Sequence, residues 1–393
     1  MLGMEKAHSY RFYPTLEQEN LLRRTLGCVR LVYNKALHER TQGWYERQER
    51  IGYNETSSML TAWKREEELA FLNEVSCVPL QQGLRHLQKA FTNFFDGRAK
   101  YPNFKKKHHG GSAEFTKSAF KYRNGQIYLA KCQEPLDVRW SRQIPQGCEP
   151  SSVTVKLHPS GRWHISIQFD DPTIKPLPAN NNAVGLDLGV TSLIATSNSD
   201  KVANPKQFKK HHPRLQLAQK RLARKQKGSK NREKARRKVA KIHLKITDSR
   251  KDFLHKLTTQ LVRENQTIAV ETLAVKNMVK NHKLALSISD SGWGEFVRQL
   301  DYKCRWYGRN LVKIDRWFPS SQRCSSCGHI IDKMPLNIRD WQCPSCGTHH
   351  DRDINASQNV LAAGLAVSVC GATVRPEQSK SVKAGAMKQK PKS

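Results

Sequence analysis

The sequence predicts a multidomain α+β protein in which a helical unit is inserted into a small β-barrel or sheet, with an α/β domain following. Three observations lead to this prediction. Helical apolar periodicity covers residues 15–96, period-two alternation marks several later segments, and apolar strands in the C-terminal half carry or end in carboxylates. At 393 residues the chain is long enough for two or three such domains.

The N-terminal elements begin with a short strand at residues 10–13. Thr15 and Gln18 then have the spacing of a capping box, which predicts a helix with one apolar face. Further helical patterns cover residues 59–71 and 79–95, so the helical unit extends to about residue 96.

The next elements are predicted to be strands. Short alternating segments occupy residues 125–129 and 136–140, and the clearest hairpin joins 153–157 to 163–169. Together they favour a small β-barrel or sheet, which a linker from 172 to 182 would follow.

The second half opens with the apolar strand 183–190, which a single carboxylate, Asp187, interrupts. A strand at 192–196 follows, and the strand 267–271 ends in Glu271. Another strand at 310–315 and a helix at about 353–363 complete this α/β unit.

The formal net charge is +34, from 68 Lys and Arg against 34 Asp and Glu. A polyanion is the natural partner of such a chain, and eight Trp, ten Tyr and thirteen Phe supply surface on which bases can stack. An anionic membrane is the weaker alternative, because the cations are spread along the whole chain and no segment has the length of a membrane span. We therefore expect nucleic acid.

Residues 206–251 concentrate this charge, with 19 Lys and Arg against two acidic residues. An apolar periodicity around a break at Gly228 and Ser229 still predicts helices there. A solvated charged face is the ordinary interpretation of such a run, but so one-sided an excess favours contact with phosphates.

Four cysteines form two CxxC pairs separated by 15 residues, namely Cys324, Cys327, Cys343 and Cys346. This spacing predicts a closed four-thiolate zinc site, which is structural because its shell leaves no position for water. Redox use is the less favoured alternative. The N-terminus lacks a segment of signal-peptide type, so we expect the chain in a reducing cytoplasm with its cysteines unpaired.

Three carboxylates stand at apolar strand ends or a helix start: Asp187, Glu271 and Asp353. Burying such groups is costly unless a cation lies between them, and two Mg²⁺ ions would satisfy them while activating water against a phosphodiester. The order strand-Asp, strand-Glu, helix-Asp suits an RNase H-like α/β fold. Singly, each is better explained as an exposed acid or a helix cap. Asp351 is the weaker rival for the third place.

Several motifs together resemble the TnpB family, transposon-associated RNA-guided DNA endonucleases related to type V CRISPR effectors. They are RFYPTLEQENLLRRTLGCVRLVYNKAL, YPNFKKK, VGLDLGV, IAVETL with VKNM, RWFPSSQRCSSCG, CPSCG and HDRDINASQNVLAAG. The resemblance covers nearly the whole chain. Thr272, after Glu271, departs from relatives that often carry an acidic or amide residue.

The resemblance implies a RuvC nuclease domain with catalytic, Mg²⁺-binding Asp187, Glu271 and Asp353, an inserted zinc ribbon, and an N-terminal β-barrel wedge holding a helical recognition domain. The implied boundaries are 1–14 and 97–175 for the wedge, 15–96 for the recognition domain, 183–318 and 349–368 for RuvC, 319–348 for the ribbon, and 376–393 for a disordered basic tail.

The resemblance also implies the partners. A guide RNA from the transposon end would pair with one strand of a double-stranded DNA target, while the protein reads a short flanking motif. We expect a monomeric prokaryotic ribonucleoprotein, cytoplasmic and associated with the nucleoid when it is bound to DNA. A guided DNA-binding regulator without cleavage and a transposase are the alternatives. Candidate nucleic-acid contacts are Gln81, Gln82, Arg85, Lys105, Lys106, Lys209, Lys210, Arg236 and Arg237.

Overall fold

The computed structural model describes residues 4–332, 334–335 and 337–369. The predicted tail at 376–393 lies outside this range. The chain forms two units: the first contains Met1–Lys175 and Gln207–Lys251, and the second contains Pro176–Lys206 and the described residues from Asp252 onward. The sequence prediction of a multidomain α/β chain is confirmed, whereas the exact domain boundaries stay a prediction.

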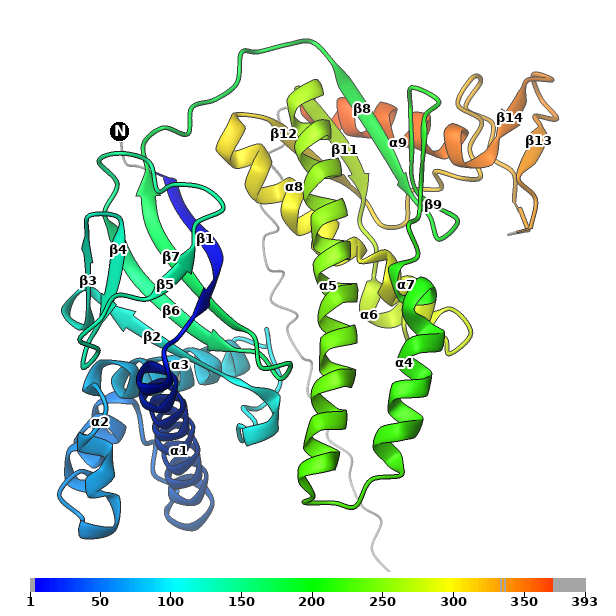
Figure 1. Ribbon diagram of the computed structural model, residues 1–393. Helices are drawn as coiled ribbons and strands as arrows, with labels where there is room; N and C mark the ends of the chain where they lie inside the picture. Colours follow the sequence, from blue (N-terminus) through cyan, green and yellow to red (C-terminus); the bar gives the residue numbers. More distant parts are fainter. Residues whose placement is uncertain (1–3, 333, 336, 370–393) are drawn as a thin grey trace, which may run out of the picture. The chain divides into compact units, whose positions relative to one another are not determined.

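The first unit contains an antiparallel five-stranded sheet in the order β2-β6-β7-β1-β5 (Figure 1). Its strands are β1 (Met4–Tyr13), β2 (Gly111–Thr116), β5 (Asp137–Arg139), β6 (Pro150–Leu157) and β7 (Trp163–Asp171). The predicted hairpin is β6-β7, in which Val153 pairs with Ile167. A second hairpin joins β3 (Phe120–Arg123) to β4 (Gln126–Leu129). Closure of the sheet into a barrel stays a prediction.

Helices inserted between β1 and β2 share a core with this sheet. They are α1 (Leu16–Arg47), α2 (Tyr53–Trp63), the 3₁₀ helix η1 (Glu67–Asn73) and α3 (Cys77–Phe95). The predicted capping box is present: the Gln18 amide donates to Thr15 Oγ1, and the Thr15 amide donates to Gln18 Oε1. Short 3₁₀ turns follow as η2 (Lys107–His109) and η3 (Lys117–Ala119).

The basic segment forms α4 (Gln207–Ala223) and the N-terminal part of α5 (Lys230–Glu264), on either side of the predicted Gly228 break. Gly228 has φ +84°, a left-handed conformation that glycine adopts without strain.

The second unit is built on a mixed sheet in the order β10-β9-β8-β11-β12. Its strands are β8 (Ala183–Leu188), β9 (Ser192–Thr196), β10 (Lys201–Ala203), β11 (Thr267–Glu271) and β12 (Asn310–Ile314). β8, β11 and β12 run parallel, and β9 and β10 run antiparallel to their neighbours.

Helices cover both faces of this second sheet. On one face, Val184 and Leu186 share a core with Leu257 of α5 and Phe296 of α8 (Trp293–Tyr307). The opposite face carries α9 (Arg352–Val369), which crosses the sheet in Figure 1. The short helices α6 (Val275–Met278) and α7 (Ala285–Ser291) and the ribbon strands β13 (Asp340–Gln342) and β14 (His349–Asp351) complete the unit.

No described helix is long and apolar enough to cross a bilayer. The nine cysteines within the described residues are all free, as expected.

Candidate functional site

Asp187 and Glu271 stand side by side at the ends of neighbouring parallel strands. The pairing of β8 with β11 places Leu186 opposite Val270, so the next residue of each strand is one of the two carboxylates. Paired residues of adjacent strands point to the same face of a sheet, and such strands lie about 4.8 Å apart. Local strand propensity and pairing therefore bring together two acids that are distant in the chain.

The helix α9 covers the face from which Asp187 emerges. Gly185 lies two residues before Asp187 and so faces the same side, where a Cβ at Gly185 would lie 2.1 Å from the carbonyl oxygen of Ser357. Gly364, further along α9, lies almost as close to Ala269 of β11: a Cβ at Gly364 would lie 2.5 Å from the Cβ of Ala269. The absence of these two side chains lets α9 seat directly on β8 and β11, with Asp353 in its first turn.

The charges of the three acids interact. Burial, followed by the negative charges of Glu271 and Asp353, raises the pKa of Asp187 to about 8. Burial also raises the pKa of Glu271, while a hydrogen bond of 2.5 Å donated by Ser320 opposes that rise. The carboxylate of Asp187 has no hydrogen bond or ion pair within the described residues. A divalent cation would remove this unfavourable concentration of charge.

Two carboxylates at the start of α9 have different surroundings. Asp351 Oδ1 accepts hydrogen bonds of 3.0 Å from the amides of Asp353 and Ile354, so Asp351 caps the helix. Its Oδ2 lies 2.5 Å from the ammonium of Lys201. Asp353 pairs with Arg339 at 3.0 Å and lies 3.7 Å from Lys201. Since Asp351 is occupied as a cap, Asp353 stays our preferred third ligand.

The three acids lie near one another without forming a tight cluster. Within the described residues, the four cysteines are the group of potential ligands whose atoms all lie within 4.8 Å of one another. In two-metal sites the Mg²⁺ ions lie about 4 Å apart. Carboxylates that bind different ions of such a pair can therefore be more than 4.8 Å from one another. The donor set is all oxygen, which is what Mg²⁺ prefers, and the residues fit it chemically.

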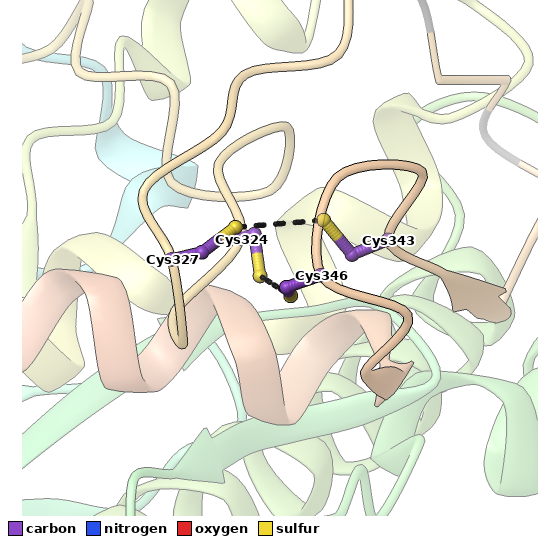
Figure 2. A group of neighbouring side chains, drawn as sticks. All are labelled: Cys324, Cys327, Cys343 and Cys346. Carbon is purple, nitrogen blue, oxygen red and sulfur yellow. Dashed lines mark hydrogen bonds between the residues drawn. The ribbon is translucent and has the colours of Figure 1, made fainter.

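The four cysteines form a second centre, shown in Figure 2. The Sγ atoms of Cys324 and Cys346 lie 3.7 Å apart, and those of Cys327 and Cys343 lie 3.6 Å apart. Zinc bound tetrahedrally by thiolates at about 2.3 Å requires sulfur separations of about 3.8 Å, so the geometry fits zinc. Hydrogen bonds from Thr348 lower the pKa of the Cys346 thiol to about 6. At Cys327 a backbone hydrogen bond lowers the pKa, but burial and hydrogen bonds with the other three thiols outweigh it and raise the pKa to about 11, so Cys346 ionises more readily than Cys327.

Hydrogen bonds join the first zinc knuckle directly to α9. The Arg323 carbonyl accepts from the side-chain amides of Asn355 (2.7 Å) and Asn359 (2.6 Å). In return, the Ser325 amide donates to Asn355 Oδ1 at 2.8 Å. Through these hydrogen bonds, the folding of this knuckle is coupled to the position of the helix that carries Asp353.

His350 lies beside the predicted zinc shell without belonging to it. Its Nε2 lies 3.0 Å from the Sγ of Cys324, and its ring packs 4.8 Å from that of Trp341. This contact suits a hydrogen bond donated by the His350 imidazole to the thiolate of Cys324, which would also bind the zinc.

The predicted nucleic-acid residues of α3 lie on its accessible side. Gln81 and Arg85 are exposed and Gln82 is half-buried. The Arg85 guanidinium also lies 4.9 Å from the centre of the Tyr53 ring, so part of its role is structural.

The other predicted nucleic-acid contacts include two residues with contacts inside the protein and four that are exposed. Lys105 is half-buried, with Nζ 3.9 Å from the ring centre of Tyr33, and burial lowers its pKa. Arg236 pairs with Glu233 at 3.0 Å. The remaining four are exposed, namely Lys106, Lys209, Lys210 and Arg237. The assignment of all nine to nucleic-acid binding stays a prediction.

Sequence reasoning missed Lys201, Ser320 and Arg339, which contact the acidic residues. Lys201 belongs to a strand of only three residues, too short to give an alternation pattern. Ser320 lies in FPSSQRC just before the first knuckle, where only its position next to the ribbon could have drawn attention.

Models of known families match three parts of the chain. Residues 164–282 match a family described as "Probable transposase", residues 293–360 match "Cas12f1-like, TNB domain", and residues 1–49 match "Helix-turn-helix domain".

Two curated relatives align over almost the whole chain. A protein of Streptomyces pristinaespiralis named "Putative RNA-guided DNA endonuclease" is 57% identical, covering 97% of this chain and 94% of the relative. A protein of Escherichia coli K12 with the same description is 33% identical, covering 94% and 95%. Among solved structures, a Cas12f1–sgRNA–target DNA complex shares the fold with a TM-score of 0.56 at 14% identity, covering 91% of this chain and 98% of that chain.

Proposed function

We propose, since this chain belongs to the TnpB family, that it is a transposon-encoded RNA-guided DNA endonuclease that cleaves DNA with Mg²⁺ in an RNase H-like, RuvC-type site. One observation supports the site above all others. Asp187 and Glu271 lie at the ends of adjacent parallel strands beneath the helix that carries Asp353, and burial, followed by the charges of the other two acids, raises the pKa of Asp187. The fold and these charges together suit phosphodiester hydrolysis.

In this mechanism Asp187, Glu271 and Asp353 would hold the cations that act on the scissile phosphate. When bound, two Mg²⁺ ions supply an activated water and stabilise the leaving oxygen. Ser320 orients Glu271 through its hydrogen bond, and Arg339 orients Asp353 through its ion pair. The zinc ribbon keeps the start of α9 in place through Asn355 and Asn359.

The partners follow from the proposed activity. The structural neighbour is a complex of Cas12f1 with a guide RNA and target DNA, and we assign the same two partners to this chain. Base pairing would supply sequence specificity, while the net charge of +34 would neutralise phosphates of both nucleic acids. We propose one protein chain per guide RNA.

The deciding experiment sequences RNA that copurifies with the full chain and then measures Mg²⁺-dependent cleavage of a matched DNA duplex. Asp187→Ala should reduce the cleavage rate below about one hundredth of wild type, because even residues outside the metal shell cost 10- to 100-fold. Asp252→Ala is the matched control, since Asp252 is an exposed acid whose ion pair among the described residues is with Lys256 on the same helix. Equal cleavage by wild type and Asp187→Ala would reject the assigned site.

The description "Probable transposase" of the family model motivates one alternative, strand transfer at transposon ends. The same preparation separates the two activities. A transposase would join DNA ends without a guide, whereas the proposed nuclease stops cutting when the copurified RNA is digested. A guided binder without cleavage would retain DNA binding and be indifferent to Asp187→Ala.

A further inference from the structure

A groove in the first unit has no role in the proposed chemistry. It consists of two adjoining cavities of about 480 and 340 Å³, which share Leu26, Arg30 and Gly110. Its walls are one face of α1, the segment 104–112, the turn between β6 and β7, and the N-terminal part of α5. The smaller cavity lies against the YPNFKKK motif.

The groove is strongly cationic. Its one acidic lining residue, Glu233, pairs with Arg236 and so offsets little of the remaining charge. The cations that have no ion pair within the described residues are Arg30, Lys105, Lys106, Lys107, Lys156 and Arg237. So many uncompensated charges around a concave surface repel one another unless an anion lies between them.

The segment that carries these lysines is held rigidly. Asn34 of α1 accepts a hydrogen bond from the Lys105 amide at 2.8 Å and donates one to the Lys105 carbonyl at 3.0 Å. At the other end, Gly110 has φ +83°, and a Cβ there would lie 2.3 Å from the Leu157 carbonyl oxygen. The groove is thus preorganised, which lowers the entropic cost of binding a ligand.

An exposed aromatic ring completes the groove. Phe104 lines the smaller cavity and is 53% exposed, although a phenylalanine normally gains free energy from burial. Aromatic rings beside a basic groove are the usual platform for unstacked bases. An acidic peptide would satisfy the lysines but gives no reason for the ring.

We propose that this groove binds a single-stranded segment of nucleic acid, with phosphates against Arg30, Lys106 and Lys156 and one base stacked on Phe104. The inference rests on the proposed function and extends it by assigning a site for the unpaired strand. The strand is either the unpaired part of the guide RNA or DNA displaced from the target, and both offer the same chemistry.

The charge contribution is tested with full-length protein stripped of nucleic acid and fluorescein-labelled U₁₆ RNA or dT₁₆ DNA as probes. Arg30→Ala with Lys156→Ala should weaken binding about tenfold and reduce the slope of log K against log salt by about 0.7 for each lost contact. Lys121→Ala with Arg123→Ala removes the same two charges from the exposed β3 strand and serves as control. Equal losses in both variants would show a diffuse charge effect and overturn the proposal.

The stacking contribution is tested separately. Phe104→Ala should weaken binding about tenfold with the salt slope unchanged, and Phe104→Tyr should restore it. Phe71→Ala, at a ring that is 41% exposed and outside the groove, is the control. A Phe104→Ala variant that binds like wild type at every salt concentration would contradict base stacking.

Photocrosslinking of the assembled ribonucleoprotein identifies the source of the strand. A crosslink between the peptide containing Phe104 and 4-thiouridine in the RNA, before DNA is added, assigns the guide; one that needs labelled DNA assigns the displaced strand. Absence of both, in a complex that retains RNA and cleaves DNA, rejects the groove but leaves the proposed function intact. A preparation without RNA or cleavage would instead reject the proposed function. The assays with the U₁₆ and dT₁₆ probes would still show whether the groove binds single-stranded nucleic acid.

Discussion

The ammonium of Lys201 lies 2.5 Å from Asp351 Oδ2, and this contact ties the edge strand β10 to the residue that caps α9. Both side chains are about one third exposed, so water screens their attraction. The other oxygen of Asp351 accepts two helix amides. The cap therefore contributes more to stability than the ion pair does.

Asp351→Ala should accordingly lower the free energy of unfolding by about 1 to 2 kcal/mol, and Lys201→Ala by less than about 1 kcal/mol. The double variant should cost less than the sum, because both changes remove the same pair. Urea unfolding of zinc-loaded protein measures all three. A larger loss for Lys201→Ala than for Asp351→Ala would contradict this ranking.

Gly185→Ala should separate α9 from β8. The added methyl would lie 2.1 Å from Ser357 O and 2.6 Å from Leu361 N, and a backbone cannot yield as a flexible side chain does. We expect a loss of about 1 to 3 kcal/mol in unfolding free energy and strongly reduced cleavage, since the same helix carries Asp353.

Gly294→Ala is the control for this prediction. Gly294 lies in the first turn of α8, and among the described residues nothing beyond the neighbouring helix backbone comes within 4 Å of the place that an added methyl would take, so alanine there should not lower stability. Similar unfolding curves for Gly185→Ala and Gly294→Ala would show that the packing of α9 on β8 does not require its backbone to approach Gly185 closely.

Zinc removal should affect cleavage through α9. Cys343→Ser is expected to release zinc, disorder the ribbon and reduce cleavage at least tenfold, while binding of the guide RNA is retained. Zinc content and cleavage are measured on the same preparation. Full cleavage by a zinc-free variant would refute the coupling.

Asn355→Ala tests that coupling with the zinc centre left intact. It removes the hydrogen bond to the Arg323 carbonyl and the acceptor of the Ser325 amide. We expect normal zinc content with partial loss of cleavage, about tenfold. A loss of zinc from this variant would instead show that Asn355 supports the ribbon itself.

Lys303 predicts a pH dependence of stability. It is only 5% exposed and its Nζ donates to Thr258 Oγ1 and Thr259 Oγ1, both at 2.7 Å, while burial lowers its pKa to about 8. The unfolded chain, with a lysine pKa near 10.5, binds more protons between pH 8 and 10.5. The free energy of unfolding contributed by Lys303 therefore rises with pH in that window and falls as pH drops through 8.

Lys303→Met removes this titration. The stability of wild type relative to the variant should increase from pH 8 towards pH 10, with a slope of up to about 1.4 kcal/mol per pH unit. Parallel stability curves for the two proteins over this range would mean that the pKa of Lys303 is unperturbed.

Features set by local interactions could be predicted from the sequence. The helix start at Thr15 and Gln18 was found because its hydrogen bonds join residues three apart. The strands that contain Asp187 and Glu271 were found because buried parallel strands are continuous apolar runs. The cysteine spacing likewise located a centre whose sulfurs the structure brings together.

Features set by distant pairing could not be predicted. The strand β2 (Gly111–Thr116) was missed because GSAEFT has little strand propensity of its own and becomes a strand by pairing with β6. The helix α8 was overlooked although Trp293, Phe296, Leu300 and Cys304 have helical spacing and Gly308 ends it with φ +64°. The contacts of Lys201 and Arg339 depend on the tertiary fold, which no local pattern specifies.

The position of α9 has a consequence for the order of events during synthesis. Asp187 is synthesised before the helix that covers its face of the sheet, which is the last of the described elements. Until residues 352–369 have been translated, the nascent chain lacks both Asp353 and the cover over Gly185. A product that ends before Arg352 would therefore lack one of the three proposed metal ligands, and under the proposed function it should not cleave DNA.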